Sequence, residues 1–281
     1  MSRELERIIA RTLEKGTDAV RSAGFNRWEF ELRNGRRLGG HARWQEGWLH
    51  FLVPLPVAGD EEWPWTLVQR NGALRGLARY VRHPKLHSGI AAEVFLPAAA
   101  SEESITGALA AIREAVRGPH EKPPSPATPE TRGGDSDPDW PALAAEHGWT
   151  LVARDEGRLA VELDAPGVMN QGFLELRDER AILSLALLRT AGLPPESRRA
   201  IALFLLSLTA RLHGTRAALA GDEAGTVRLE VVLPDRARAS ALELDLALEA
   251  LSLGARLASR EVRALATETL AGSYLAFTLK E

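Results

Sequence analysis

Residues 93–97, EVFLP, recur in the second half of the chain as residues 230–234, EVVLP. Each copy precedes an alanine-rich stretch that predicts a helix. Each copy also follows a short motif, LRG at residues 74–76 and LHG at residues 212–214, which lies 17 and 16 residues before the glutamate of its copy. Because the same segments occur in the same order at nearly the same spacing, the sequence predicts two repeats of one structural unit.

A segment without large apolar side chains separates the two copies. Residues 119–138 combine several prolines with two adjacent glycines and many polar residues. Such a segment cannot bury enough apolar surface to offset the entropy that is lost when a backbone is ordered. The sequence therefore predicts a linker at 119–138 between a first domain, 1–118, and a second domain, 139–281.

The composition of the 281-residue chain is that of a globular protein, with 45% hydrophobic and 26% charged residues. Its formal net charge of −3 argues against a protein that binds nucleic acid through a strongly basic surface. The absence of cysteine excludes disulfides, thiol catalysis and cysteine-based metal sites. The N-terminal segment lacks the apolar core of a signal peptide, and no apolar run approaches the ~20 residues of a membrane span. We therefore expect a cytoplasmic protein that does not act at a membrane.

Strands are predicted in hairpins in both halves. Residues 27–33 alternate between charged and apolar side chains, which is typical of a strand with one buried face, and Asn34-Gly35 is a strong hairpin signal. The preceding apolar residues have helical spacing as far as Val20, which predicts a helix that ends near Gly24. Because hairpins build antiparallel sheets, we predict an α+β fold whose halves each have the order helix, three strands, helix, two strands and helix.

This element order, found in both halves, resembles that of the class I chaperones of type III secretion systems and the wider bacterial family of chaperone-like domains. The resemblance implies that two copies pair through the middle helix and the neighbouring strand. It also implies that a partner polypeptide wraps around apolar grooves on the pair. A tandem repeat would then form a covalent pseudo-dimer. The chain departs from the family in being longer than one family unit and only weakly acidic.

The middle helix of the second half is apolar on all sides over residues 201–206, IALFLL. Such a helix must be covered on more than one side, and its own sheet covers only one. The matching segment of the first half is rich in tryptophan and leucine, so the sequence predicts that the two helices meet between the halves; the alternative is burial inside one large domain. The residues predicted at this interface are Trp63, Trp65, Leu67, Val68, Leu203, Phe204 and Leu206.

A second apolar surface is predicted between the first helix of each half and its sheet. In the first half the helix carries Leu5, Ile9 and Leu13 on one stripe, with charged residues between them. These three side chains are the candidate lining of a groove for a partner polypeptide. Ordinary core packing is the alternative for all three.

The signatures of common catalytic and metal sites are missing. His83 and His87 have the four-residue spacing of a helical metal pair, but Pro84 interrupts the segment. His41 and His50 are predicted on neighbouring strands, where exposed polar residues are ordinary. The chain has no nucleophile elbow and no glycine-rich phosphate loop. We therefore expect a non-enzymatic protein that binds another polypeptide through apolar surface, with no catalytic residue, no cofactor and no metal.

Two other functions stay open at this point. One is an enzyme that uses histidine and carboxylate side chains. The other is a single-stranded nucleic-acid binder, because an arginine-rich sheet beside aromatic side chains can stack bases. The residues that would serve this second function lie around the first hairpin and are Arg27, Arg33, Arg36, Arg37, Arg43, Trp44 and Trp48.

Overall fold

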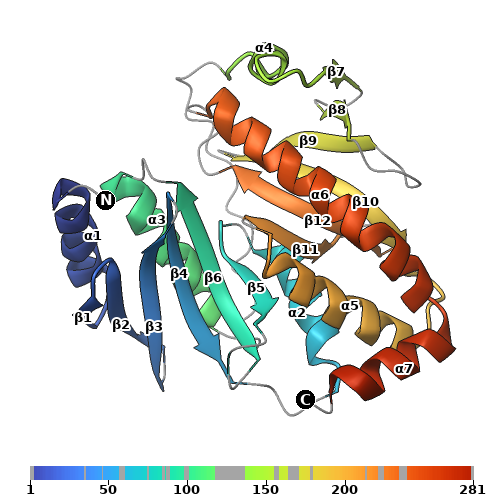
Figure 1. The fold of residues 1–281 in the computed structure, drawn as a ribbon, viewed down its shortest axis with the longest axis horizontal. Coiled ribbons are helices and arrows are strands. Elements are labelled where there is room, and N and C mark those ends of the chain that lie inside the picture. The colour runs from blue at the N-terminus through green and yellow to red at the C-terminus, as the bar shows by residue number, and fades with distance from the viewer. Residues whose placement is uncertain are drawn as a thin grey trace. The chain divides into compact units, whose positions relative to one another are not determined.

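The computed structural model describes residues 3–34, 36–45, 47–56, 61–74, 76–83, 86, 89–97, 101–117, 137–154, 158–163, 171–177, 180–212, 214–220, 225–233 and 239–279. The described residues contain two six-stranded antiparallel sheets with helices packed on them (Figure 1), which confirms the predicted α+β class. The chain divides into two compact units. The first unit holds residues 1–59 and 74–122, and the second holds residues 60–73 and 123–281.

The first unit is built on a sheet with the strand order β1-β2-β3-β4-β6-β5. Helix α3 contacts β2, β4 and β6, and α1 packs against α3 and β1 (Figure 1). The bounds of its elements are α1 (Arg3–Gly16), β1 (Ala19–Gly24), β2 (Arg27–Asn34), β3 (Arg36–Gln45), β4 (Trp48–Leu55), β5 (Arg79–Arg82), β6 (Ile90–Pro97) and α3 (Glu102–Val116).

The first helix is shorter than predicted, and an additional strand follows it. Helix α1 ends at Gly16, and β1 then pairs antiparallel with β2. The turn between them requires positive φ angles, which are +122° at Gly24 and +59° at Asn26. Among the described residues each half has four strands before its middle helix, one more than in the predicted order.

The second unit is built on a sheet with the strand order β11-β12-β10-β9-β8-β7. Helix α6 runs across β10 and β12, and α5 contacts α6 and α7 (Figure 1). The bounds of its elements are α2 (Trp63–Ala73), α4 (Trp140–Ala145), β7 (Leu151–Ala153), β8 (Arg158–Glu162), β9 (Gln171–Arg177), β10 (Arg180–Arg189), α5 (Pro195–Thr209), β11 (Thr215–Leu219), β12 (Thr226–Leu233), α6 (Ala241–Leu265) and α7 (Glu268–Thr278).

Within the described residues the two halves have the same element order, helix, four strands, helix, two strands and helix, and α7 of the second half has no described counterpart. Their sheets also have the same strand order when one of them is read in reverse. The register agrees at the repeated motif, because Glu93 lies opposite Arg79 and Glu230 lies opposite Arg216 on the preceding strand. The chain therefore consists of two similar halves.

Helix α2 belongs to the first half by sequence but packs in the second unit. It contacts β11 and α5, and its backbone approaches β11 closely at Gly72. A Cβ atom on Gly72 would lie 2.3 Å from the carbonyl oxygen of Leu219, so glycine is needed there. The predicted first domain, 1–118, included this helix, whereas the structure groups residues 60–73 with residues 123–281. Most of the predicted linker, residues 119–136, lies outside the described residues.

Candidate functional site

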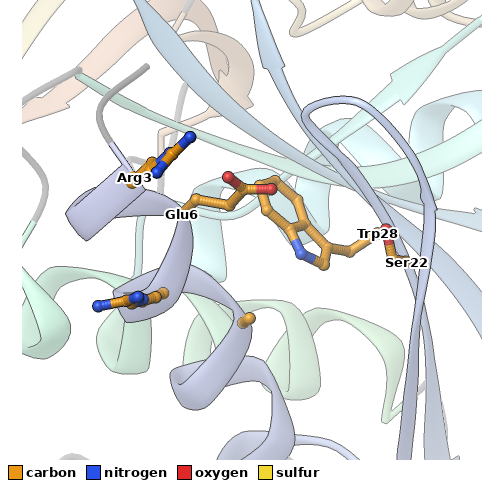
Figure 2. Close-up of a pocket in the computed structure, with 6 residues that line it drawn as sticks. Arg3, Glu6, Ser22 and Trp28 are labelled. Atoms are coloured by element: carbon orange, nitrogen blue, oxygen red, sulfur yellow. The ribbon is translucent and has the colours of Figure 1, made fainter.

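A shallow groove of about 350 Å³ lies between α1 and the first two strands of the first unit. Helix α1 is amphipathic, and its two faces have different surroundings. One face buries Ile9 and Leu13 completely, while another borders the groove. The groove-lining residues, drawn in Figure 2, are Arg3, Glu6, Arg7, Ala10, Ser22 and Trp28.

The indole of Trp28 forms the floor of the groove. Trp28 lies on β2 directly opposite Ser22 of β1, and it is only 5% exposed. In Figure 2 its ring extends from the strand toward α1. Because Ser22 is small and exposed, it leaves part of the groove beside the indole open. Only a small part of the indole is therefore open to the groove, beneath a rim of polar side chains.

The rim of the groove is mainly basic, with Arg3 and Arg7 on α1 and Glu6 between them. All three side chains are exposed. Strand β1, which supplies Ser22, is the edge strand of the sheet, and five of its six residues are exposed. An exposed edge strand beside a groove is an arrangement that an extended peptide can use, by adding a strand and placing side chains in the groove.

The structure places the predicted groove residues mostly elsewhere. Ile9 and Leu13 have no exposed surface and pack in the core, so they cannot line a binding groove; Leu5 is half-buried. A groove does exist between the first helix and its sheet, but the residues on its α1 side are the charged ones and Ala10. Trp28 and Ser22 were not predicted in the groove, because their pairing depends on β1, whose residues were predicted to continue the first helix.

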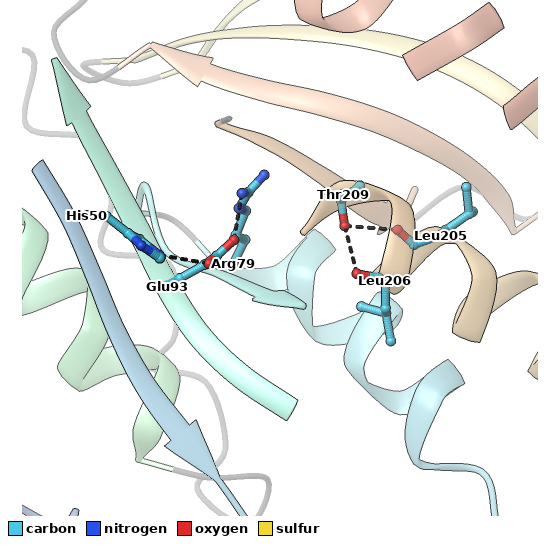
Figure 3. Close-up of polar contacts among 6 residues, drawn as sticks. All are labelled: His50, Arg79, Glu93, Leu205, Leu206 and Thr209. Atoms are coloured by element: carbon cyan, nitrogen blue, oxygen red, sulfur yellow. Dashed lines mark hydrogen bonds and ion pairs between the residues drawn. The ribbon is translucent and has the colours of Figure 1, made fainter. Parts of the chain in front are cut away.

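A buried ionic cluster lies on the other face of the same sheet, at its opposite edge. Tyr80 donates a hydrogen bond to the carbonyl oxygen of Ala115 in α3, so its neighbour Arg79 points away from α3. Arg79 Nη2 is 2.6 Å from Glu93 Oε1, and His50 Nε2 is 2.9 Å from Glu93 Oε2 (Figure 3). The His50 ring stacks on Phe95 at 4.1 Å between centroids.

The pKa of Glu93 reflects opposing effects. Burial by itself would raise the pKa of this carboxyl, but the positive charge of Arg79 and the hydrogen bonds from His50 and Arg79 outweigh it and lower the pKa. Burial also lowers the pKa of Arg79, although the nearby negative charge of Glu93 acts to raise it. Glu93 is therefore held as a carboxylate inside the protein.

The second half repeats the pair but not the histidine. Arg216 Nη2 is 2.8 Å from Glu230 Oε2, both side chains are almost completely buried, and Arg228 also contacts Glu230. Since the arginine and the glutamate recur in both halves while the third group differs, the pair is a property of the fold. This recurrence favours a structural role for the Arg79–Glu93 pair.

The residues predicted at an interface between the halves lie on α2 and α5, which contact each other within the second unit. Trp65, Leu67 and Val68 of α2 are buried, as are Leu203 and Leu206 of α5, whereas Trp63 and Phe204 are half-buried. Phe204 packs edge-to-face against Tyr274 of α7, with 6.5 Å between centroids. The apolar α5 is covered by α2, α6, α7 and β11, and Thr209 donates to carbonyl oxygens of its last turn (Figure 3).

The first hairpin brings together only part of the predicted nucleic-acid surface. Arg27 lies opposite Arg43, and Arg33 lies opposite Arg37, so these arginines share the outer face of β2 and β3. Trp44 follows Leu38 and Ala42 on the inner face of β3 and cannot stack a base beside them. Trp48 of β4 lies opposite Gln45, on the same face as these arginines, and is half-buried. The side chain of Arg36 lies outside the described residues.

The parts of the chain that the structure describes show neither a metal site nor a membrane-spanning helix. There, no group of three or more histidine, aspartate or glutamate side chains could hold a metal ion. His41 lies opposite Leu52 and His50 lies opposite Arg43, so the two histidines are not direct cross-strand partners, and His87 falls outside the described residues. None of the described helices combines the length and the hydropathy that crossing a bilayer requires.

Comparison with protein-family models finds no match to this chain, and comparison with curated proteins finds no significant match.

Proposed function

We propose that the chain is a non-enzymatic, chaperone-like module that binds another polypeptide in the groove beside α1. The observation that carries this proposal is the position of the buried Trp28 indole at the floor of a groove next to the exposed edge strand β1. The backbone of an extended segment could form hydrogen bonds with the backbone of β1, as an added strand does, and place a side chain in the groove beside the indole.

The chemistry of the groove selects the kind of segment. The indole favours an apolar or aromatic side chain, since aromatic pairs contribute ~0.5–1.5 kcal/mol beyond their buried area. The exposed Arg3 and Arg7 favour acidic side chains beside it. The preferred partner is therefore an extended segment in which an apolar or aromatic residue stands next to aspartate or glutamate.

We also propose that the two halves are repeats that form a covalent pseudo-dimer. Their common element order and strand order support this, as does the packing of α2, from the first half, on α5 and β11 of the second. In the chaperone-like family, which the chain resembles, the middle helix and the neighbouring strand are the elements through which two copies pair.

The binding proposal is tested by selecting random peptides on the full chain and measuring the affinity of the selected peptides for variants. Ala10→Phe would fill the groove, and Arg7→Glu would reverse the charge of its rim. Either change should weaken binding about tenfold or more, which corresponds to ~1.4 kcal/mol. Arg11→Glu is the matched control, because Arg11 is an exposed α1 residue outside the groove lining, and it should leave the affinity unchanged.

The proposal is wrong if the selected peptides bind Ala10→Phe as tightly as the unchanged chain. Circular dichroism of each variant establishes that the fold is retained. Turnover of a small molecule that is lost on replacing a single histidine or carboxylate would instead support the enzyme alternative.

A further inference from the structure

Helix α6 exposes a stripe of four leucines on the side that faces away from its sheet. Leu242, Leu246, Leu253 and Leu257 are 57%, 37%, 42% and 47% exposed. At 100° per residue they fall within about 60° of arc around the helix. The opposite face of α6 is apolar as well, and it includes the buried residues Leu244, Leu248, Leu251, Ala255 and Val262.

The sheet-facing side of α6 is buried within the second unit, whereas the side that carries the four leucines remains exposed. The stripe covers residues 242–257, which is about 22 Å of helix at 1.5 Å per residue. The helix is well defined at its start, where Ser240 and Glu243 form a capping box. The leucines are therefore held on one side of a preformed helix, and exposed apolar side chains gathered on one side favour an interaction site.

The spacing of the leucines is symmetric. Their separations of four, seven and four residues are the same when the helix is read from either end. In a dimer with two-fold symmetry the same surface of both copies meets itself, so residue i contacts j and j contacts i. An antiparallel pair of α6 helices places Leu242 opposite Leu257 of the second copy and Leu246 opposite Leu253.

The charges along α6 favour the same arrangement. The first half of the helix is acidic, and the second half is mainly basic, with Glu261 as its exception. Antiparallel packing brings the acidic half of one copy beside the basic half of the other, whereas parallel packing brings like charges together. The residues concerned are Glu243 and Asp245 in the first half and Arg256, Arg260 and Arg263 in the second, whereas Glu249 lies near the midpoint of the stripe.

We propose that α6 is a self-association surface through which two copies of this chain pair antiparallel, with the four leucines at the centre of the contact. The surface lies in the second unit, whereas the α1 groove lies in the first. The inference therefore does not depend on the proposed binding of a partner polypeptide.

The oligomeric state of the full chain, measured by analytical ultracentrifugation over a range of concentrations, tests the proposal. The unchanged chain should sediment as a dimer that dissociates on dilution. Leu246→Glu with Leu253→Glu should raise the dimer dissociation constant about a hundredfold or more. Leu270→Glu is the matched control, because Leu270 is an exposed leucine of α7, 50% exposed, and it should leave the dimer intact. A chain that stays monomeric at every concentration, including one that binds lipid vesicles or a different protein through the stripe, would overturn the proposal.

Disulfide trapping tests the orientation, since the chain has no cysteine of its own. Copies carrying Leu242→Cys should cross-link to copies carrying Leu257→Cys when the two are mixed and oxidised. Copies carrying only Leu242→Cys should remain uncross-linked, because antiparallel packing separates the two equivalent positions by the length of the stripe. Efficient cross-linking of Leu242→Cys copies to one another would contradict the antiparallel arrangement.

Discussion

Glu93 shows how a single residue of the repeated motif acquires its role. It is completely buried between Arg79 and His50, and its counterpart Glu230 is buried against Arg216 in the same register. Both members of a buried ion pair lose their hydration when the protein folds. The net contribution of the intact pair to folding stability is therefore small. The removal of one partner leaves an uncompensated charge, and this makes the pair sensitive to mutation.

We predict that Glu93→Gln lowers the free energy of unfolding by about 3–5 kcal/mol, because it leaves the buried Arg79 without its counter-charge. The double variant Arg79→Met with Glu93→Leu should lose much less, since it removes both charges. Urea unfolding measures all three. The control is Glu29→Gln, which breaks the exposed ion pair with Arg21 and should cost about 0–1 kcal/mol. Equal losses in the single and the double variant would contradict the prediction.

The lowered pKa of Glu93 also predicts an acid dependence of stability. Its folded-state pKa lies below the ordinary value of 4.5, so the carboxylate stabilises the folded state above that pH. This contribution is lost as the pH falls from 4.5 through the folded-state pKa. Between pH 5 and pH 3 the unfolding free energy of the unchanged chain should therefore fall more steeply than that of Glu93→Gln. Parallel pH profiles, measured by thermal or urea unfolding, would exclude this role.

At the scale of single elements, secondary structure was predicted best where the periodicity of apolar residues is strong and worst at the edge of the sheet. Strand β2 was predicted from the alternation of residues 27–33, and its hairpin with β3 is confirmed. Strand β1 was missed because AVRSAG, at residues 19–24, has five exposed positions and so no alternation of apolar residues. The predicted groove lining was instead Leu5, Ile9 and Leu13, since Trp28 and Ser22 come together only when β1 pairs with β2.

The packing of α2 on β11 gives a prediction at the same scale. Gly72→Ala should lower the free energy of unfolding by about 1–3 kcal/mol, because its Cβ would meet a backbone oxygen of Leu219 at 2.3 Å. Gly107→Ala in α3 is the matched control, since a Cβ there would have no atom within 4 Å apart from the neighbouring residues and backbone of its own helix, and alanine should stabilise that helix by up to ~1 kcal/mol. Thermal unfolding distinguishes the two, and a neutral Gly72→Ala would mean that α2 does not approach β11 so closely.

The antiparallel α6 pair gives another prediction for this helix. When Leu242 packs opposite Leu257 and Leu246 opposite Leu253, the two-fold axis passes between residues 249 and 250. The two copies of Glu249 then approach each other. Glu249→Ala should then tighten the dimer several-fold by removing this repulsion. Sedimentation at low salt measures the change. Weaker association of Glu249→Ala would indicate a shifted register in which Glu249 faces an arginine.

At the scale of the whole molecule, the repeat of residues 93–97 and 230–234 predicted the common architecture of the halves, but not the unit in which α2 packs. Local periodicity predicts α2 as a helix, whereas its location depends on the fit of Gly72 against β11 and of Trp65 and Val68 in the core of the second unit. Contacts of this kind join segments far apart in the sequence, and no local pattern encodes them.

Helix α2 belongs to the first half of the sequence but packs in the second unit, and this predicts how the two halves behave when they are separated. Residues 139–281 produced alone lack α2, so α5 and β11 lose part of their cover, and the fragment should unfold at a lower temperature than the full chain or aggregate. Addition of residues 1–118 should restore stability by supplying α2. Size-exclusion chromatography and thermal unfolding of the mixture test this. If residues 139–281 alone are as stable as the intact chain, α2 contributes little to the second unit.

The position of α2 also sets an order of events during translation. The helix leaves the ribosome long before its partners, because α2 ends at Ala73 whereas α5 starts at Pro195 and β11 at Thr215. At ~5–20 residues per second, the nascent helix waits on the order of ten seconds for β11 to be synthesised. Throughout this interval Trp65 and Val68 have no partner to cover them. The nascent chain is therefore most vulnerable to aggregation during synthesis of its second half.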